Sequence, residues 1–118
     1  MALCMLVCVC VCVCEQAARR LIISGAEGDQ AKYINGSYEP VDEGRGVAYQ
    51  KREDSDMWLE RHAPYKKWIV TDTEGRGTRS GWATLLCDPP RLPTDPRGAK
   101  WRVVVNGKLV EQPGVKCV

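Results

Sequence analysis

The feature that most limits the fold of this chain is a run of short apolar segments, each with a tryptophan at its second position, separated by polar turns. These segments are residues 57–61, 67–71 and 81–86. Each is too short to form a stable helix alone, and each is rich in the aromatic and β-branched residues typical of strands. Consecutive strands joined by short links usually pair in antiparallel order. The sequence therefore predicts an all-β fold, an antiparallel meander that curls into a small barrel or sandwich.

The clearest turn lies near the C-terminus, where Asn106-Gly107 separates two apolar runs. Asn-Gly between such runs favours a type I′ hairpin turn, because both central residues of that turn need positive φ. A two-residue turn also fixes the register of the two strands. The predicted pairs are Val105 with Lys108, Val104 with Leu109, Val103 with Val110, and Arg102 with Glu111. We expect the side of this hairpin that carries Trp101, Val103 and Val110 to face the core.

Three further segments complete the predicted domain, which we place at residues 33–118. Residues 33–40 are expected to be extended, and residues 47–52 alternate as a half-buried strand does, with Val47 and Tyr49 on one face. Residues 87–98 contain four prolines, which exclude a central strand and predict an irregular surface loop. The chain has no Phe, so the tryptophans are expected to supply most of the large side-chain volume of the core.

The N-terminal extension, residues 1–32, opens with a low-complexity tract in which Cys and Val alternate. Five of the seven cysteines lie in its first fourteen positions. A translated TG repeat or a misplaced start codon explains such a tract. The alternatives are a secretory signal without a preceding basic residue, a membrane span that is too short, and a metal-binding tract without a second cluster. The protein is cytoplasmic if the tract is an artefact and secreted if it is a signal. Residues 15–23 are expected to form a short helix, and the rest of the extension to be disordered.

The charges on this chain nearly balance, with 17 Lys and Arg residues against 15 Asp and Glu residues. A net charge of +2 gives no general reason to expect a nucleic acid or an anionic membrane as partner. His62 is the only histidine, so a metal site with two imidazoles is excluded. The sequence predicts no metal site, no cofactor and no catalytic residue. One enzymatic arrangement stays open, a Cys87–His62 nucleophile pair, for which a buried thiol and a solvated imidazole are the alternative.

Two binding hypotheses follow from the aromatic and basic residues. In the first, a partly exposed tryptophan among Trp58, Trp68 and Trp82 stacks on a carbohydrate or peptide; the alternative is that every tryptophan is core. Its basic neighbours are Arg61, His62, Lys66 and Lys67. In the second, a basic rim contacts an anionic partner; the alternative is ordinary solvated loop charge. The rim residues are Arg76 and Arg79 with Lys66 and Lys67.

Two further sites depend on the compartment. If the chain is secreted, Cys87 and Cys117 are candidates for a disulfide that closes a long loop. The sequence Asn35-Gly36-Ser37 fits the N-glycosylation pattern, so Asn35 is the candidate for glycan attachment under the same condition. In a reducing compartment the two cysteines are expected to be thiols.

A series of short motifs runs along residues 33–113. It consists of Asn35-Gly36, Tyr38-Glu39-Pro40, Tyr49-x-Lys51-Arg52, Trp58-Leu59-Glu60, Trp68-x-Val70, Gly81-Trp82-Ala83, Asp88-Pro89-Pro90 and the closing hairpin with Trp101. This series resembles a β-rich module repeated in large multidomain proteins of protists, including dinoflagellate algae. No activity is assigned to that module, so the resemblance implies a β-rich fold and no particular reaction.

The function predicted from the sequence is that of a non-catalytic binding or scaffolding module with an unidentified ligand. Carbohydrate, peptide and protein are the candidate partners. Two alternatives stay open, a fragment of an enzyme that lacks its catalytic partner domain, and a spurious or truncated gene product.

Overall fold

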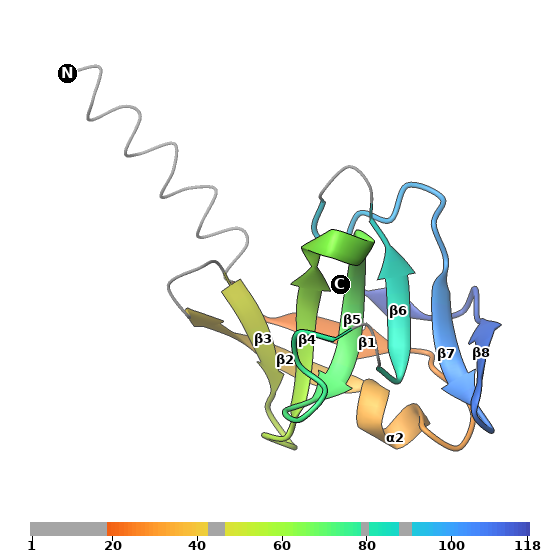
Figure 1. The fold of residues 1–118 in the computed structure, drawn as a ribbon, viewed down its shortest axis with the longest axis horizontal. Helices are drawn as coiled ribbons and strands as arrows, with labels where there is room; N and C mark the ends of the chain where they lie inside the picture. The colour runs from red at the N-terminus through yellow and green to blue at the C-terminus, as the bar shows by residue number, and fades with distance from the viewer. Residues whose placement is uncertain (1–18, 43–46, 79–80, 88–90) are drawn as a thin grey trace.

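The computed structural model describes residues 19–42, 47–78, 81–87 and 91–118. Within these residues the chain forms one antiparallel sheet of nine strands that curls into a half-barrel (Figure 1). The strands are β1 (Leu21–Ser24), β2 (Gly36–Asp42), β3 (Val47–Lys51), β4 (Met57–His62), β5 (Lys67–Asp72), β6 (Ala83–Leu86), β7 (Trp101–Val105), β8 (Lys108–Glu111) and β9 (Lys116–Cys117). Two short helices are α2 (Ala31–Ile34) and the 3-10 helix η1 (Ala63–Tyr65). The predicted all-β antiparallel meander is confirmed.

The strand order across the sheet is β8-β7-β6-β5-β4-β3-β2-β1-β9, so β1 to β8 follow one another as they do in the sequence. The three tryptophan segments correspond to the adjacent strands β4, β5 and β6. β9 joins the sheet by pairing with β1, where Cys117 lies opposite Ile23. The first and last described strands therefore meet at one edge of the sheet, and β8 forms the other edge.

The Asn106-Gly107 turn has the predicted geometry, with φ angles of 50° and 81° that lie in the left-handed region. All four predicted pairs between β7 and β8 are present. Trp101 and Val103 face the core as expected and are 3% and 0% exposed, whereas Val110 shares their face by pairing with Val103 but is 43% exposed. Every residue of β8 is exposed because this strand lies at the sheet edge, beyond the strands that curl around the core.

The core lies on one face of the curled sheet, which we call the inner face; the opposite side is the outer face. Side chains alternate between the two faces, as the two-residue period of a strand requires. Large side chains of the core include those of Tyr38, Tyr49, Leu59, Trp68, Leu85 and Trp101. The tryptophans were expected to fill much of the core, and this is confirmed for Trp68 and Trp101.

Part of the expected N-terminal extension belongs to the sheet. A helix was expected over residues 15–23. This is wrong for residues 21–23, because Leu21–Ser24 is a strand paired with both β2 and β9. Leu21 and Ile23 are each 1% exposed, so the apolar side chains follow the period of a strand. Residues 33 and 34 end the helix α2, and the extended segment expected there begins with β2. The fold thus includes residues that precede the expected boundary at residue 33.

Three sequence predictions fall outside the described residues. They concern the Cys and Val tract within residues 1–18, the rim residue Arg79, and the prolines within residues 88–90. The described part of the proline-rich loop contains no strand before β7, as expected. No helix in the described ranges has the length and apolar character that crossing a membrane requires.

Candidate functional site

Trp58 lies on the outer face of β4, and the loop between β5 and β6 folds back over it. The Arg76 guanidinium lies 3.8 Å from the centre of the indole ring. The indole nitrogen donates a hydrogen bond to Thr73 Oγ1 at 2.9 Å, and only 8% of Trp58 is exposed. Because a cation already covers the ring face, a ligand would stack on Trp58 only by displacing Arg76.

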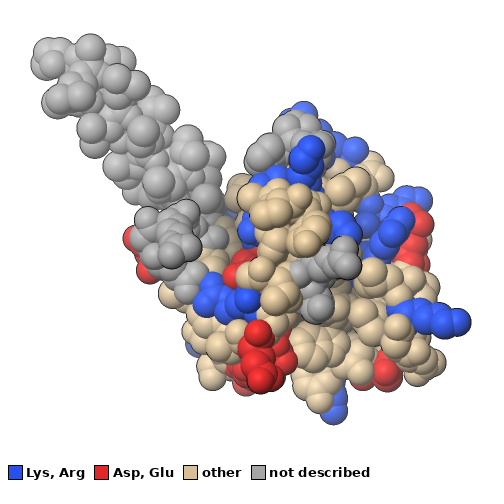
Figure 2. All heavy atoms as spheres, viewed as in Figure 1, with Lys and Arg blue, Asp and Glu red and all other residues tan. Residues whose placement is uncertain are grey.

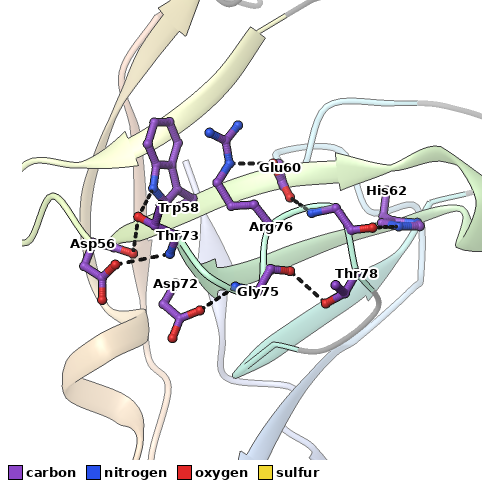
Figure 3. A network of polar contacts seen from close by, with 10 residues as sticks. Asp56, Trp58, Glu60, His62, Asp72, Thr73, Gly75, Arg76 and Thr78 are labelled. Atoms are coloured by element: carbon purple, nitrogen blue, oxygen red, sulfur yellow. Dashed lines mark hydrogen bonds and ion pairs between the residues drawn. The ribbon is translucent and has the colours of Figure 1, made fainter.

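The next outward-facing residues of β4 hold the same loop (Figure 3). The Glu60 carboxylate accepts hydrogen bonds from Arg76 Nε at 3.0 Å and from Gly77 N at 2.9 Å. His62 Nε2 is hydrogen-bonded to the Gly77 carbonyl oxygen at 2.9 Å. The side chains of Arg76 and Glu60 are 23% and 17% exposed, so their ion pair is partly buried. We call the set of Trp58, Glu60, His62 and Arg76 the β4 clamp.

The β4 clamp gives a structural role to residues that the sequence placed in binding sites. Arg76 is expected in a basic rim, yet its side chain contacts Glu60 and Trp58. Arg79, the other rim residue of this loop, lies outside the described residues. Lys66 is exposed in the turn after η1, with a left-handed φ of 55°. Arg76 is therefore held in the β4 clamp, and the basic rim as a whole stays a prediction.

The two remaining candidate tryptophans differ in exposure. Trp68 points to the inner face, is 5% exposed, and donates from its indole nitrogen to the Arg91 carbonyl oxygen at 2.7 Å. Trp82 is partly exposed and packs against Tyr33, with ring centres 5.9 Å apart. It lines a shallow pocket of about 260 Å³ together with Asp72. Of the three candidates, Trp82 is the one with indole surface left for a ligand.

Cys87 and His62 point to opposite faces of the sheet. His62 is on the outer face, where it stacks on Tyr65 with ring centres 4.7 Å apart. Cys87 is 1% exposed within the core, and its sulfur is hydrogen-bonded to the backbone of Arg91. Arg61, a predicted binding residue, donates to the Cys87 carbonyl oxygen at 2.9 Å. The structure thus does not bring Cys87 and His62 together as nucleophile and base. In the described ranges no group of three His, Cys, Asp or Glu side chains is placed to hold a metal ion.

Two predicted sites depend on secretion: the disulfide between Cys87 and Cys117, and the glycan on Asn35. Cys87 and Cys117 are both buried and are not joined by a disulfide. Burial raises the pKa of the Cys117 thiol to about 12. The Asn35 side chain accepts a hydrogen bond from Ala26 N and donates one to Ala26 O, both at 3.0 Å. A glycan attached to the Asn35 nitrogen would disturb the second of these bonds.

Basic side chains gather elsewhere on the outer face, around the neighbouring ends of β5, β6 and β7. A shallow hollow of about 190 Å³ lies there. Its lining, which we call the outer groove, consists of Lys67, Thr84, Leu86, Ala99, Lys100, Arg102 and Glu111. Strand register explains the grouping, because Lys67 pairs with Leu86 and Arg102 pairs with both Thr84 and Glu111. Figure 2 shows Lys and Arg side chains gathered toward the upper right of the same view, where these strand ends lie.

The outer groove carries three cationic side chains and one carboxylate. Lys100 Nζ lies 3.9 Å from Glu111 Oε1. No carboxylate of the described residues forms an ion pair with Lys67 or Arg102. Leu86 is 55% exposed. The groove therefore combines an exposed apolar side chain with positive charge that is only partly compensated.

Sequence reasoning identified Lys67 but not the rest of the outer groove. The pairing of Arg102 with Glu111 was predictable, because the hairpin turn fixes it. The approach of Thr84 to Arg102 was not, because the proline-rich loop between their strands carries no pairing signal. Comparison with models of known protein families, with curated proteins and with solved structures gives no match. The resemblance to the protist module stays a prediction, and function has to be argued from the site.

Proposed function

We propose that this domain is a non-catalytic binding module, and that the outer groove binds an acidic peptide segment of a partner protein. The observation that carries the proposal is the grouping of Lys67, Lys100 and Arg102 on one face around the exposed side chain of Leu86. Cationic side chains attract carboxylates, and an exposed apolar side chain among them adds contact area for an apolar residue of the ligand. An acidic peptide offers both kinds of group.

The remaining charges favour a peptide over a uniformly charged polymer. Glu111 lies within the outer groove and repels a ligand that is negative along its whole length. The net charge of +2 also supplies little of the long-range attraction on which nucleic-acid binding depends. A peptide can place an acidic side chain beside Arg102 and a neutral one beside Glu111.

The expected affinity is modest, because the cations of the groove are exposed. Each exposed ion pair contributes about 0.2–1 kcal/mol. Reversing one charge removes an attraction and adds a repulsion, so Arg102→Glu is expected to weaken binding by about tenfold. Raising the salt concentration is expected to weaken binding as well, because exposed charges are screened.

Fluorescence anisotropy of a labelled synthetic peptide of repeating Glu-Val-Ser-Val, which we call the Glu-Val peptide, tests the proposal. Arg52→Glu is the matched control: it makes the same charge change at an exposed residue that follows β3, outside the groove. The proposal expects binding to the wild type and to Arg52→Glu, and weaker binding to Arg102→Glu. Equal affinities for the two variants, or equal binding of a peptide with Lys in place of Glu, would overturn it.

A second candidate function, carbohydrate binding, is favoured by the pocket at Trp82. One carboxylate oxygen of Asp72 accepts a hydrogen bond from Gly75 N at 2.7 Å, and the other can accept from a sugar hydroxyl. A partly exposed indole beside a carboxylate suits a sugar ring, whose carbon face is apolar and whose edge carries hydroxyls. Titration of tryptophan emission with monosaccharides tests this candidate: a saturable change in the wild type that is lost in Trp82→Phe would support it, and no change would exclude it.

A further inference from the structure

β8 presents an open edge next to the outer groove. It is the last strand of the sheet, and β7 is its one partner among the described strands. Leu109 and Val110 are 48% and 43% exposed, although both are apolar. An exposed edge strand offers backbone donors and acceptors to another extended chain.

The register shows which backbone groups of β8 point away from β7. Residues that close a two-residue hairpin turn exchange hydrogen bonds, and such pairs then recur at every second position. The bond from Gln112 N to Trp101 O, at 2.9 Å, agrees with this parity. Val110 therefore bonds inward to Val103. The backbone N–H and C=O groups of Leu109 and Glu111 point outward, to the open edge.

The open edge is continuous with the outer groove. Glu111 belongs to both, and the Lys100 ammonium group reaches to within 3.9 Å of its carboxylate. A strand added beside β8 would lie roughly 4.8 Å away, with every second side chain on the outer face. An acidic side chain at one of these positions lies within reach of Lys100 and Arg102, and a neutral side chain suits the position opposite Glu111. The intervening side chains lie beside Val110 on the inner face.

We infer that the acidic segment binds as an added β-strand along β8, with an acidic residue at the β7–β8 side of the outer groove, near Lys100 and Arg102, and a neutral residue opposite Glu111. This inference rests on the proposed function and specifies its binding mode. Main-chain hydrogen bonds to Leu109 and Glu111 supply affinity, and the groove selects the ligand by charge.

Leu109→Pro tests the inference on the full chain. Proline removes the outward N–H of residue 109 and no hydrogen bond of the β7–β8 ladder, and proline is tolerated in an edge strand where its nitrogen faces solvent. The Glu-Val peptide is expected to bind this variant about tenfold more weakly than the wild type, because an acceptor of the peptide loses its donor. Leu109→Ala is the matched control, since it shortens the side chain and keeps the N–H group.

A pair of N-methylated peptides gives a test that leaves the protein unchanged. Each peptide carries methyl groups on alternate amide nitrogens, and the two patterns are complementary. Strand addition uses the N–H groups of one edge of the peptide, so one methylated peptide is expected to bind like the parent and the other to lose binding. This test decides the matter if Leu109→Pro does not fold.

The outcomes separate the inference from the proposed function. If the parent peptide binds, Arg102→Glu weakens it, and neither Leu109→Pro nor either methylation pattern matters, then strand addition is wrong and the groove function stands. If the parent peptide does not bind, both are overturned. If the wild type instead forms dimers in sedimentation that Leu109→Pro abolishes, β8 pairs with a second copy of the chain, which contradicts an acidic peptide as its occupant.

Discussion

Removal of the Glu60 carboxylate is expected to release the β5–β6 loop from the outer face of the sheet. This carboxylate accepts hydrogen bonds from Arg76 Nε at 3.0 Å and from Gly77 N at 2.9 Å, with its side chain 17% exposed. A hydrogen bond to a charged group contributes about 1.5–3 kcal/mol, and partial exposure lowers this value through solvent screening. We therefore expect Glu60→Ala to lower the free energy of unfolding by about 2 kcal/mol.

Urea unfolding followed by circular dichroism measures this change. Glu39→Ala is the matched control, because Glu39 is exposed on the same face at β2, and its effect is expected to stay within about 0.5 kcal/mol. Loss of the Arg76 contact is also expected to expose the Trp58 ring and to move the emission of the folded protein to longer wavelength. Equal unfolding free energies for Glu60→Ala and Glu39→Ala would refute the reasoning.

Three further changes test other parts of the structure. Burial raises the pKa of the Cys117 thiol from 9.0 to about 12, so its contribution to the free energy of unfolding is present below pH 9 and is lost as the pH rises toward 12. The urea midpoint of the wild type is therefore expected to fall over this pH range, and that of Cys117→Ala is expected to fall less. Asn35→Ala is expected to lower the free energy of unfolding by about 1–3 kcal/mol, because it removes both hydrogen bonds to Ala26; an unchanged urea midpoint would contradict this. Gly81→Ala is expected to cost about 1–3 kcal/mol, measured in the same way, because the added methyl group would lie 2.5 Å from the Val70 carbonyl oxygen.

The parts of the fold that follow from local signals could be predicted from the sequence. The short apolar runs of β4 and β5, each with a tryptophan, indicate strands by themselves, and Asn106-Gly107 sets both the turn type and the register of the last hairpin. The same reasoning failed at Leu21–Ser24, where β1 depends on pairing with β9 at the opposite end of the chain. The helix there was predicted from the helix propensity of the residues, and pairing between distant strands outweighs that propensity.

The candidate site was harder to predict because it depends on contacts between distant residues. Nothing local in the sequence indicates that the β5–β6 loop returns over Trp58 and that Arg76 pairs with Glu60. Lys67 was identified for its charge, but its grouping with Arg102 needs the register of β5, β6 and β7 together. A residue pattern shows which side chains are available, and only the sheet shows which of them share a face.

An NMR titration of the isotope-labelled protein with the Glu-Val peptide tests the outer groove most directly. The backbone amide signals of Lys67, Leu86, Lys100 and Arg102 are expected to shift together and to saturate at one affinity, while those of Arg76 and Gly77 in the loop over β4 stay in place. Shifts confined to the β5–β6 loop or to Trp82, or no saturable shift at any groove residue, would contradict binding of an acidic peptide in the outer groove.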